Sequence, residues 1–254
     1  MSHFSVAVLS HTPDDVEDLL APFFESTENP EYLEFEVASE SMDEIRSTFE
    51  REKEPSETLE DFVSRWYGYT YNAELDAWGY LCNPNAKWDW WELCGRWSDT
   101  LKLKPGRKGN RADRTWPDTK EPRKKGYCDQ AQLKDIDFFP DPQAYNEALR
   151  FWEVVVEGRP LREGEDPGQF RLHASREYYL KQFQDKEQYA LACTSFNTWA
   201  LVTPDGDWHE SGTMGWFGTS NATPQSRSRH GEFLRSTLAN ADPEMWLSIV
   251  DCRI

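Results

Sequence analysis

The sequence has no long hydrophobic run. Its uncharged apolar stretches are far shorter than the ~18–20 residues that a helix needs to cross a bilayer. Residues 1–9 lack a basic region, and their apolar run is too short for a signal peptide. We therefore expect no membrane partner and a cytoplasmic location.

Positive charge is also scarce. The 254 residues contain 28 Lys and Arg against 46 Asp and Glu, which gives a formal net charge of -18. This sign disfavours generic nucleic-acid binding, because phosphate backbones attract basic surfaces. Residues 102–125 are the exception, with 10 basic and 3 acidic residues, whereas residues 1–101 carry 6 basic and 23 acidic residues. The Lys, Arg, Gly and Pro content of 102–125 predicts a long, mobile basic loop that could contact phosphates.

Several short motifs of known chemistry are missing. The five cysteines show no C-x-x-C spacing, and the chain has no H-E-x-x-H, G-x-x-x-x-G-K-[ST] or G-x-S-x-G sequence. We accordingly predict no metal site and no cofactor, and we interpret the cysteines as reduced, buried thiols.

Aromatic residues, by contrast, are abundant. The chain has 12 Trp, 10 Tyr and 14 Phe, which is ample material for a hydrophobic core and excludes wholesale disorder. We expect a single domain over residues 1–254, interrupted by the basic loop at about 102–125.

Periodicity predicts an α+β fold. Residues 3–9 alternate as a strand, residues 246–254 are expected to form a terminal strand, and residues 197–209 a hairpin around Asp205-Gly206. Another strand is expected at 32–37. Helical spacing and capping residues predict helices at 12–23, 41–51, 59–67, 142–156, 175–189 and 229–238. The expected architecture is a mostly antiparallel sheet with packed helices, in which the terminal strands are candidate neighbours.

The densest chemical cluster is the segment 83–97. It sets Lys87, Asp89 and Arg96 among several indoles. Burying such charges is costly unless they pair or meet a ligand, and an arginine fork suits a carboxylate or phosphate. The cluster therefore predicts either a ligand pocket or an internal ion pair beneath an aromatic core.

A second cluster is the segment 208–218, where three glycines recur at a period of three around Met214 and Trp216. Such spacing suits a tight bend or a close backbone approach. His209 and Glu210 are adjacent in this cluster, so on a strand they would face opposite sides. We interpret His209 as an ordinary hairpin residue.

Motifs at both ends and in the middle of the chain carry a family resemblance. They are Met1–Phe4, Asn83–Pro84, Lys87–Trp90, Gly95–Ser98, Leu101–Gly106, Asp129–Ala131, Asp135–Asp137, Gly212–Gly218 and Val250–Ile254. Together they resemble a family of hypothetical proteins met mainly in bacteriophages and in bacterial genomes that carry mobile elements. No settled activity belongs to that family, so the resemblance implies a bacterial host and a context rather than a reaction.

The resemblance also implies which positions matter. The signature positions are Lys87, Trp88, Asp89, Gly95, Arg96, Asp129, Met214, Gly215 and Trp216. This chain departs from the pattern at Cys94, where a glycine is expected, and at Arg253, where a histidine is more usual. Both departures argue against a mechanism that depends on a histidine there.

Three functions remain open from the sequence. The first is binding of a small anionic or nucleotide-like ligand, which in a phage context would suit counter-defence by sequestering a signalling nucleotide. The second is a hydrolase or transferase acting on phosphorylated or nucleic-acid substrates. The third is an interaction protein whose acidic surface occupies a basic host protein. The predicted ligand site comprises Lys87, Trp88, Asp89, Arg96, Trp97, Asp129, Met214 and Trp216.

Overall fold

The computed structural model describes residues 2–113, 122–171 and 173–254. The chain divides into two compact units. The larger unit contains the residues up to Leu20 together with Trp90–Ile254, and the smaller unit is Ala21–Asp89. The single domain expected from the sequence stays a prediction, because compactness does not show whether the units fold independently.

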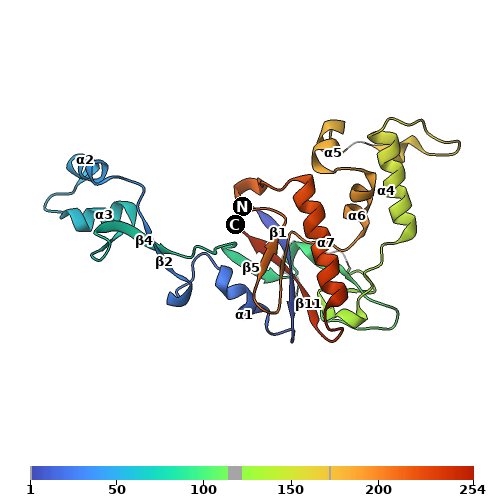
Figure 1. Cartoon of the computed structure of the whole chain (residues 1–254), viewed down its shortest axis with the longest axis horizontal. Coiled ribbons are helices and arrows are strands. Elements are labelled where there is room, and N and C mark those ends of the chain that lie inside the picture. Colours follow the sequence, from blue (N-terminus) through green and yellow to red (C-terminus); the bar gives the residue numbers. More distant parts are fainter. Residues whose placement is uncertain (1, 114–121, 172) are drawn as a thin grey trace. The chain divides into compact units, whose positions relative to one another are not determined.

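A mixed sheet organises the larger unit (Figure 1). Its strands run in the order β10-β9-β1-β11-β5, and β8 also pairs with β11. The strands are β1 (His3–Ser10), β5 (Trp90–Leu93), β8 (Gln130–Gln132), β9 (Ala200–Val202), β10 (Trp208–Glu210) and β11 (Trp246–Arg253). Every pairing is antiparallel except that of β1 with β9. The predicted α+β fold with a mostly antiparallel sheet is therefore confirmed.

The terminal strands form the centre of this sheet. The β1–β11 register runs from His3 opposite Arg253 to Ser10 opposite Trp246. The chain ends consequently lie side by side, as Figure 1 shows. The predicted adjacency of the terminal strands is confirmed.

The strand alternation separates two faces of the sheet. Residues Ala7 and Leu9 of β1 belong to a core cluster that also contains Ile249 of β11 and Leu234 and Leu238 of helix α7. Helix α7 (Pro224–Asn240) therefore covers one face. It begins five residues before the predicted helix at 229–238, because Thr223 and Ser226 form a capping box around Pro224.

The remaining helices of the larger unit are short, apart from α4. They are α1 (Val16–Leu20), α4 (Pro142–Val155), α5 (Arg176–Gln182) and α6 (Lys186–Thr194). The single helix predicted at 175–189 is wrong: Phe183 adopts an extended conformation with φ -132°, and Asp185 caps a new helix by accepting from the Gln188 backbone N–H. The larger unit also contains the short 3-10 helices η3 (Gly95–Trp97), η4 (Leu133–Asp135), η5 (Pro167–Phe170) and η6 (Trp216–Gly218), whereas η1 (Ala21–Phe23) and η2 (Pro30–Tyr32) belong to the smaller unit.

The smaller unit pairs two helices with a three-stranded antiparallel sheet of order β2-β4-β3. Its elements are β2 (Glu34–Val37), α2 (Met42–Glu52), α3 (Leu59–Tyr67), β3 (Thr70–Asn72) and β4 (Ala77–Cys82). Ile45, Phe62, Val63 and Trp78 form its core. The helices and β2 lie where the sequence predicts them, whereas β3 and β4 were not predicted.

Strand pairing holds the described residues of the basic segment 102–125 to neighbouring parts of the chain. Strand β6 (Leu101–Lys102) pairs with β7 (Tyr127–Cys128), and Asn110 bridges to Gln130. Residues 114–121 of the predicted loop lie outside the described residues. Over the described part of the chain, no helix combines the length and hydropathy needed to cross a bilayer.

Candidate ligand pocket

A cavity of about 350 Å³ lies beside the first residues of β1. We call it the His3 pocket. Segments that are far apart in the sequence meet there, from the N-terminus, the turn after β5, the segment that leads into β9, the segment after β10 and the first half of α7. Its lining comprises His3, Phe4, Ser5, Trp97, Phe183, Ala192, Asn197, Thr198, Trp199, Ser211, Met214, Arg227 and His230.

Trp199, one of the lining residues, has an unsatisfied donor. The indole Nε1 of Trp199 is buried, and no described residue accepts its hydrogen bond. The backbone N–H of Trp199 is satisfied by the carbonyl oxygen of Ser5 at 2.9 Å, which fixes the position of the residue. A buried N–H without an acceptor costs about 1–3 kcal/mol, so Trp199 lowers the stability of this part of the fold.

A cation lines the same pocket. The Arg227 guanidinium donates to the side-chain oxygen of Gln182, which is a neutral acceptor. No described carboxylate forms an ion pair with Arg227. Since Arg227 is only half-buried on α7, its positive charge is available to an anion that enters the pocket.

His230 presents a hydrogen-bond acceptor. Burial lowers the pKa of His230 below its usual value, which favours the neutral imidazole. Its Nε2 lies 3.0 Å from the carbonyl oxygen of Thr198, and a carbonyl can only accept. Nε2 therefore carries the proton, and Nδ1 keeps a lone pair that can accept from a ligand N–H or O–H.

His3 is oriented by a buried carboxylate. Its Nδ1 lies 2.9 Å from Oδ1 of Asp251, a residue with no exposed surface. The other carboxylate oxygen of Asp251 accepts the backbone N–H of Arg96 at 3.0 Å. A carboxylate that holds Nδ1 in this way leaves Nε2 of the imidazole free to accept a proton, as a general base requires.

A second acid stands close to Asp251. Glu92 of β5 is its partner across the strand pair. Burial, and then the negative charge of Asp251, raise the pKa of Glu92 above its usual value, while His3 acts in the opposite direction. One carboxylate oxygen of Glu92 is buried without a hydrogen-bond partner among the described residues. The end of the sheet therefore concentrates two carboxyl groups and an imidazole.

Two of the predicted site residues line the His3 pocket. Trp97 comes from the first aromatic cluster and Met214 from the second, so parts of both clusters meet in the larger unit. Trp216 lies in η6. The sequence analysis missed His3, Trp199, Arg227 and His230. Their spacing carries no signal, since the fold alone brings them together.

Two other predicted residues have structural contacts. Arg96 is exposed, and its backbone N–H holds Asp251. Asp129 is fully buried and accepts hydrogen bonds from the backbone N–H groups of Asp99 and Ala112 and from the guanidinium of Arg123. Neither lines the His3 pocket. Asp129 instead ties the described ends of the basic segment to the fold.

The remaining predicted residues belong to the smaller unit. Trp88 is buried and stacks on Phe24, with ring centroids 4.7 Å apart. Lys87 is half-buried and its backbone N–H donates to the carbonyl oxygen of Phe23 at 2.8 Å, and Asp89 is also half-buried. That these three side chains share a ligand site with residues of the larger unit stays a prediction.

The comparisons with known proteins identify no relative. No family model matches the chain, and searches of curated proteins and of solved structures give no significant match. Among residues 2–113, 122–171 and 173–254, no group of three or more His, Cys, Asp or Glu side chains could hold a metal ion.

Proposed function

We propose that the larger unit binds a small anionic ligand of nucleotide type in the His3 pocket. The observation that carries this proposal is the Arg227 guanidinium, which lines the pocket and pairs with no described carboxylate. A phosphate or carboxylate oxygen would accept from it. Its charge would complement a guanidinium whose described partner is neutral.

The other lining residues favour a ligand with a planar ring. The indole of Trp97 offers a face on which a nucleobase can stack. The free Nδ1 of His230 can accept from an exocyclic amine or a ring N–H. A volume of about 350 Å³ lies in the range of small-molecule pockets.

Calorimetric titration tests this proposal. A panel of nucleoside monophosphates, cyclic dinucleotides and inorganic phosphate would be titrated into the protein, into Arg227→Gln and into Arg229→Gln. Arg229 is exposed on the same helix and does not line the His3 pocket, so it is the matched control. We expect at least one nucleotide to bind, and Arg227→Gln to weaken it by about tenfold or more, since a hydrogen bond to a charged group contributes about 1.5–3 kcal/mol.

Two results would refute the proposal. One is the absence of binding by every member of the panel. The other is binding that Arg227→Gln and Arg229→Gln weaken equally, which would place the ligand elsewhere. Both variants should keep the thermal midpoint of the wild type, because neither position belongs to the core.

A second candidate function is hydrolysis of a phosphorylated substrate, and the pairing of His3 with Asp251 favours it. With Asp251 at Nδ1, His3 Nε2 would accept a proton from an attacking water, and Arg227 would stabilise the charge that develops on the phosphate. Chromatography of the nucleotides after the same titrations distinguishes the two functions. Turnover that His3→Gln abolishes, without loss of binding, would favour the enzyme.

The biological role follows only if the phage resemblance is correct. A protein of that origin that retains a nucleotide without converting it would suit sequestration of a host signalling molecule. This part of the proposal rests on the resemblance and not on the geometry of the pocket.

A further inference from the structure

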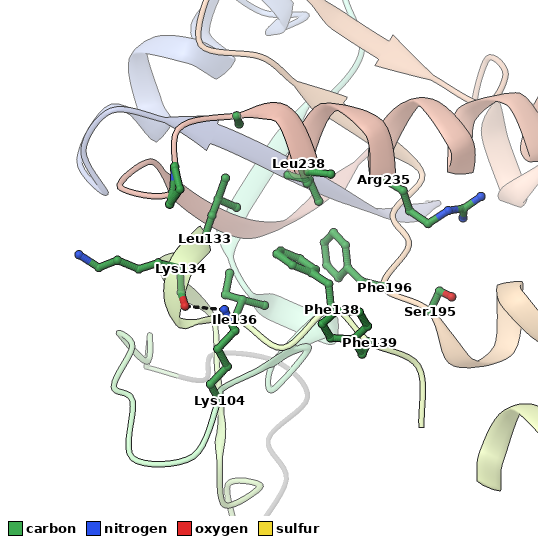
Figure 2. Close-up of a pocket in the computed structure, with 13 residues that line it drawn as sticks. Lys104, Leu133, Lys134, Ile136, Phe138, Phe139, Ser195, Phe196, Arg235 and Leu238 are labelled. Carbon is green, nitrogen blue, oxygen red and sulfur yellow. Dashed lines mark hydrogen bonds between the residues drawn. The ribbon is translucent and has the colours of Figure 1, made fainter. Parts of the chain in front are cut away.

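A separate cavity of about 530 Å³ lies against the C-terminal half of α7 (Figure 2). We call it the Phe138 cavity. None of its lining residues lines the His3 pocket. Its floor consists of Leu133, Ile136 and Leu238, which belong to the main hydrophobic core. A cavity that reaches the core in this way offers an apolar surface without any rearrangement of the fold.

Aromatic side chains form the walls of the Phe138 cavity. Phe138 and Phe196 meet edge to face, with centroids 5.6 Å apart. Phe139 lines the cavity as well, yet 81% of its surface is exposed. An exposed phenyl group beside an apolar cavity leaves hydrophobic surface in contact with water, and such surface often marks a binding site.

The polar groups of the cavity are few, and two of them lie on one side. Figure 2 shows Arg235 and Ser195 together on the side of Phe196 away from Leu133. The hydroxyl oxygen of Ser195 is buried without a described hydrogen-bond partner. No described carboxylate pairs with Arg235. Both groups can donate, so this side of the cavity suits an anionic oxygen pair.

The cationic groups on the other side are already engaged. Lys134 pairs with Glu244 at 2.5 Å, and Nζ of Lys104 donates to the carbonyl oxygen of Lys134 at 2.7 Å, the dashed line in Figure 2. The side of Arg235 and Ser195 is therefore the one that selects an anion. A ligand that fills the cavity needs one anionic end and an apolar body.

We propose that the Phe138 cavity binds an amphipathic carboxylate, namely a medium-chain fatty acid. Its carboxylate accepts from the Ser195 hydroxyl and from the Arg235 guanidinium. Its acyl chain lies over Ile136 and Leu133 beside the Phe138–Phe196 pair, and covers part of Phe139. This arrangement satisfies the orphaned hydroxyl and removes the exposed aromatic surface from water in a single binding event.

Calorimetry with decanoate and decanol, both below their aggregation limits, tests this inference. The two probes share the acyl chain and differ in charge. The variants are Arg235→Gln and Ser195→Ala, with Arg229→Gln, on the same helix but outside this cavity and outside the His3 pocket, as the matched control. Thermal midpoints of all variants would be measured first, so that a change in binding is separated from a change in folding.

We expect decanoate to bind at least about tenfold more tightly than decanol. Arg235→Gln should reduce decanoate binding to the level of decanol, and Arg229→Gln should leave it unchanged. Ser195→Ala should also weaken the binding of decanoate. It should raise the thermal midpoint of the free protein, because it removes an unsatisfied polar group. The inference is overturned if decanoate does not bind, or if it binds no better than decanol and Arg235→Gln has no effect. Because the two pockets share no residue, this result is independent of the nucleotide test.

Discussion

Two aspartates and a histidine of the larger unit are almost fully buried, and they differ in how they are satisfied. Asp129 accepts three hydrogen bonds, and Asp251 is held by His3 and by the Arg96 N–H. His230 has one protein partner, the carbonyl oxygen of Thr198. The two aspartates are therefore structural anchors, whereas His230 keeps a nitrogen available to a ligand.

The lowered pKa of His230 predicts a loss of stability in mild acid. Its folded-state pKa lies below the unfolded value of about 6.5, so the unfolded chain binds more protons between those two values. The free energy of unfolding should fall as the pH decreases below about 6.5 and through the folded-state pKa, by about 1.4 kcal/mol for each unit between the two. Urea unfolding at pH 7.5 and 5.5 measures this loss.

His230→Gln should reduce this dependence on pH. Glutamine cannot take up the proton, so part of the loss between the two pH values should disappear. His173→Gln is the control for the same substitution at an exposed position. Equal losses in the wild type and in His230→Gln would show that other groups, such as His209 or Glu210 nearby, cause the effect.

The contacts of the buried acids show which parts of the site could not be predicted from the sequence at the residue scale. Asp129 looks like a ligand-binding residue in the sequence, since nothing there reveals that Arg123, six residues earlier, folds back onto it. Likewise, His3 meets Asp251 only because the two terminal strands pair. Contacts between residues brought together by tertiary structure carry no local signal.

At the scale of elements, the turn between β5 and η3 packs against Asp251, the carboxylate that orients His3. Cys94 has φ 63° and Gly95 has φ 44°, and a Cβ built on Gly95 would lie 2.4 Å from the side chain of Asp251. Any larger residue at position 95 would displace the carboxylate that orients His3. A glycine is therefore required at position 95 for two reasons: the positive φ, and the short distance between its backbone and the side chain of Asp251.

Gly95→Ala should destabilise the protein by about 2–5 kcal/mol. About 1–2 kcal/mol comes from a positive φ at a residue with a Cβ, and about 1–3 kcal/mol from overpacking against Asp251. Gly106→Ala is the matched control, since Gly106 has φ 77° with open space where a Cβ would lie, and it should lose only the backbone contribution. Urea unfolding of both variants measures the difference, and equal losses would contradict the close contact.

The elements that the sequence predicted share clear local signals. β1 and β11 are short runs rich in apolar residues near the two ends of the sequence, the hairpin surrounds Asp205-Gly206, and α4 begins at a proline that follows a capping aspartate. The break between α5 and α6 was missed because an apolar residue, Phe183, continues the helical pattern while its backbone is extended. The short strands β3, β4 and β5 lie in the tryptophan-rich part of the chain, where little alternation is visible.

At the scale of the whole molecule, charge is distributed unevenly between the units. The smaller unit, residues 21–89, contains 17 acidic and 5 basic residues, so it carries most of the net charge of -18. The pocket and the cavity described above both belong to the larger unit. The proposed ligand sites and most of the negative charge thus belong to different parts of the chain.

Native mass spectrometry of protein purified gently from cells tests the central claim most directly, because it needs no prior choice of ligand. We expect an adduct of defined mass that is released on denaturation, contains an anionic group, is lost in Arg227→Gln and is retained in Arg229→Gln. Retention in Arg227→Gln but loss in Arg235→Gln would assign the adduct to the Phe138 cavity instead. A mass without adduct, unchanged when the nucleotide panel is added in excess, would contradict the claim that the His3 pocket binds a nucleotide-like anion.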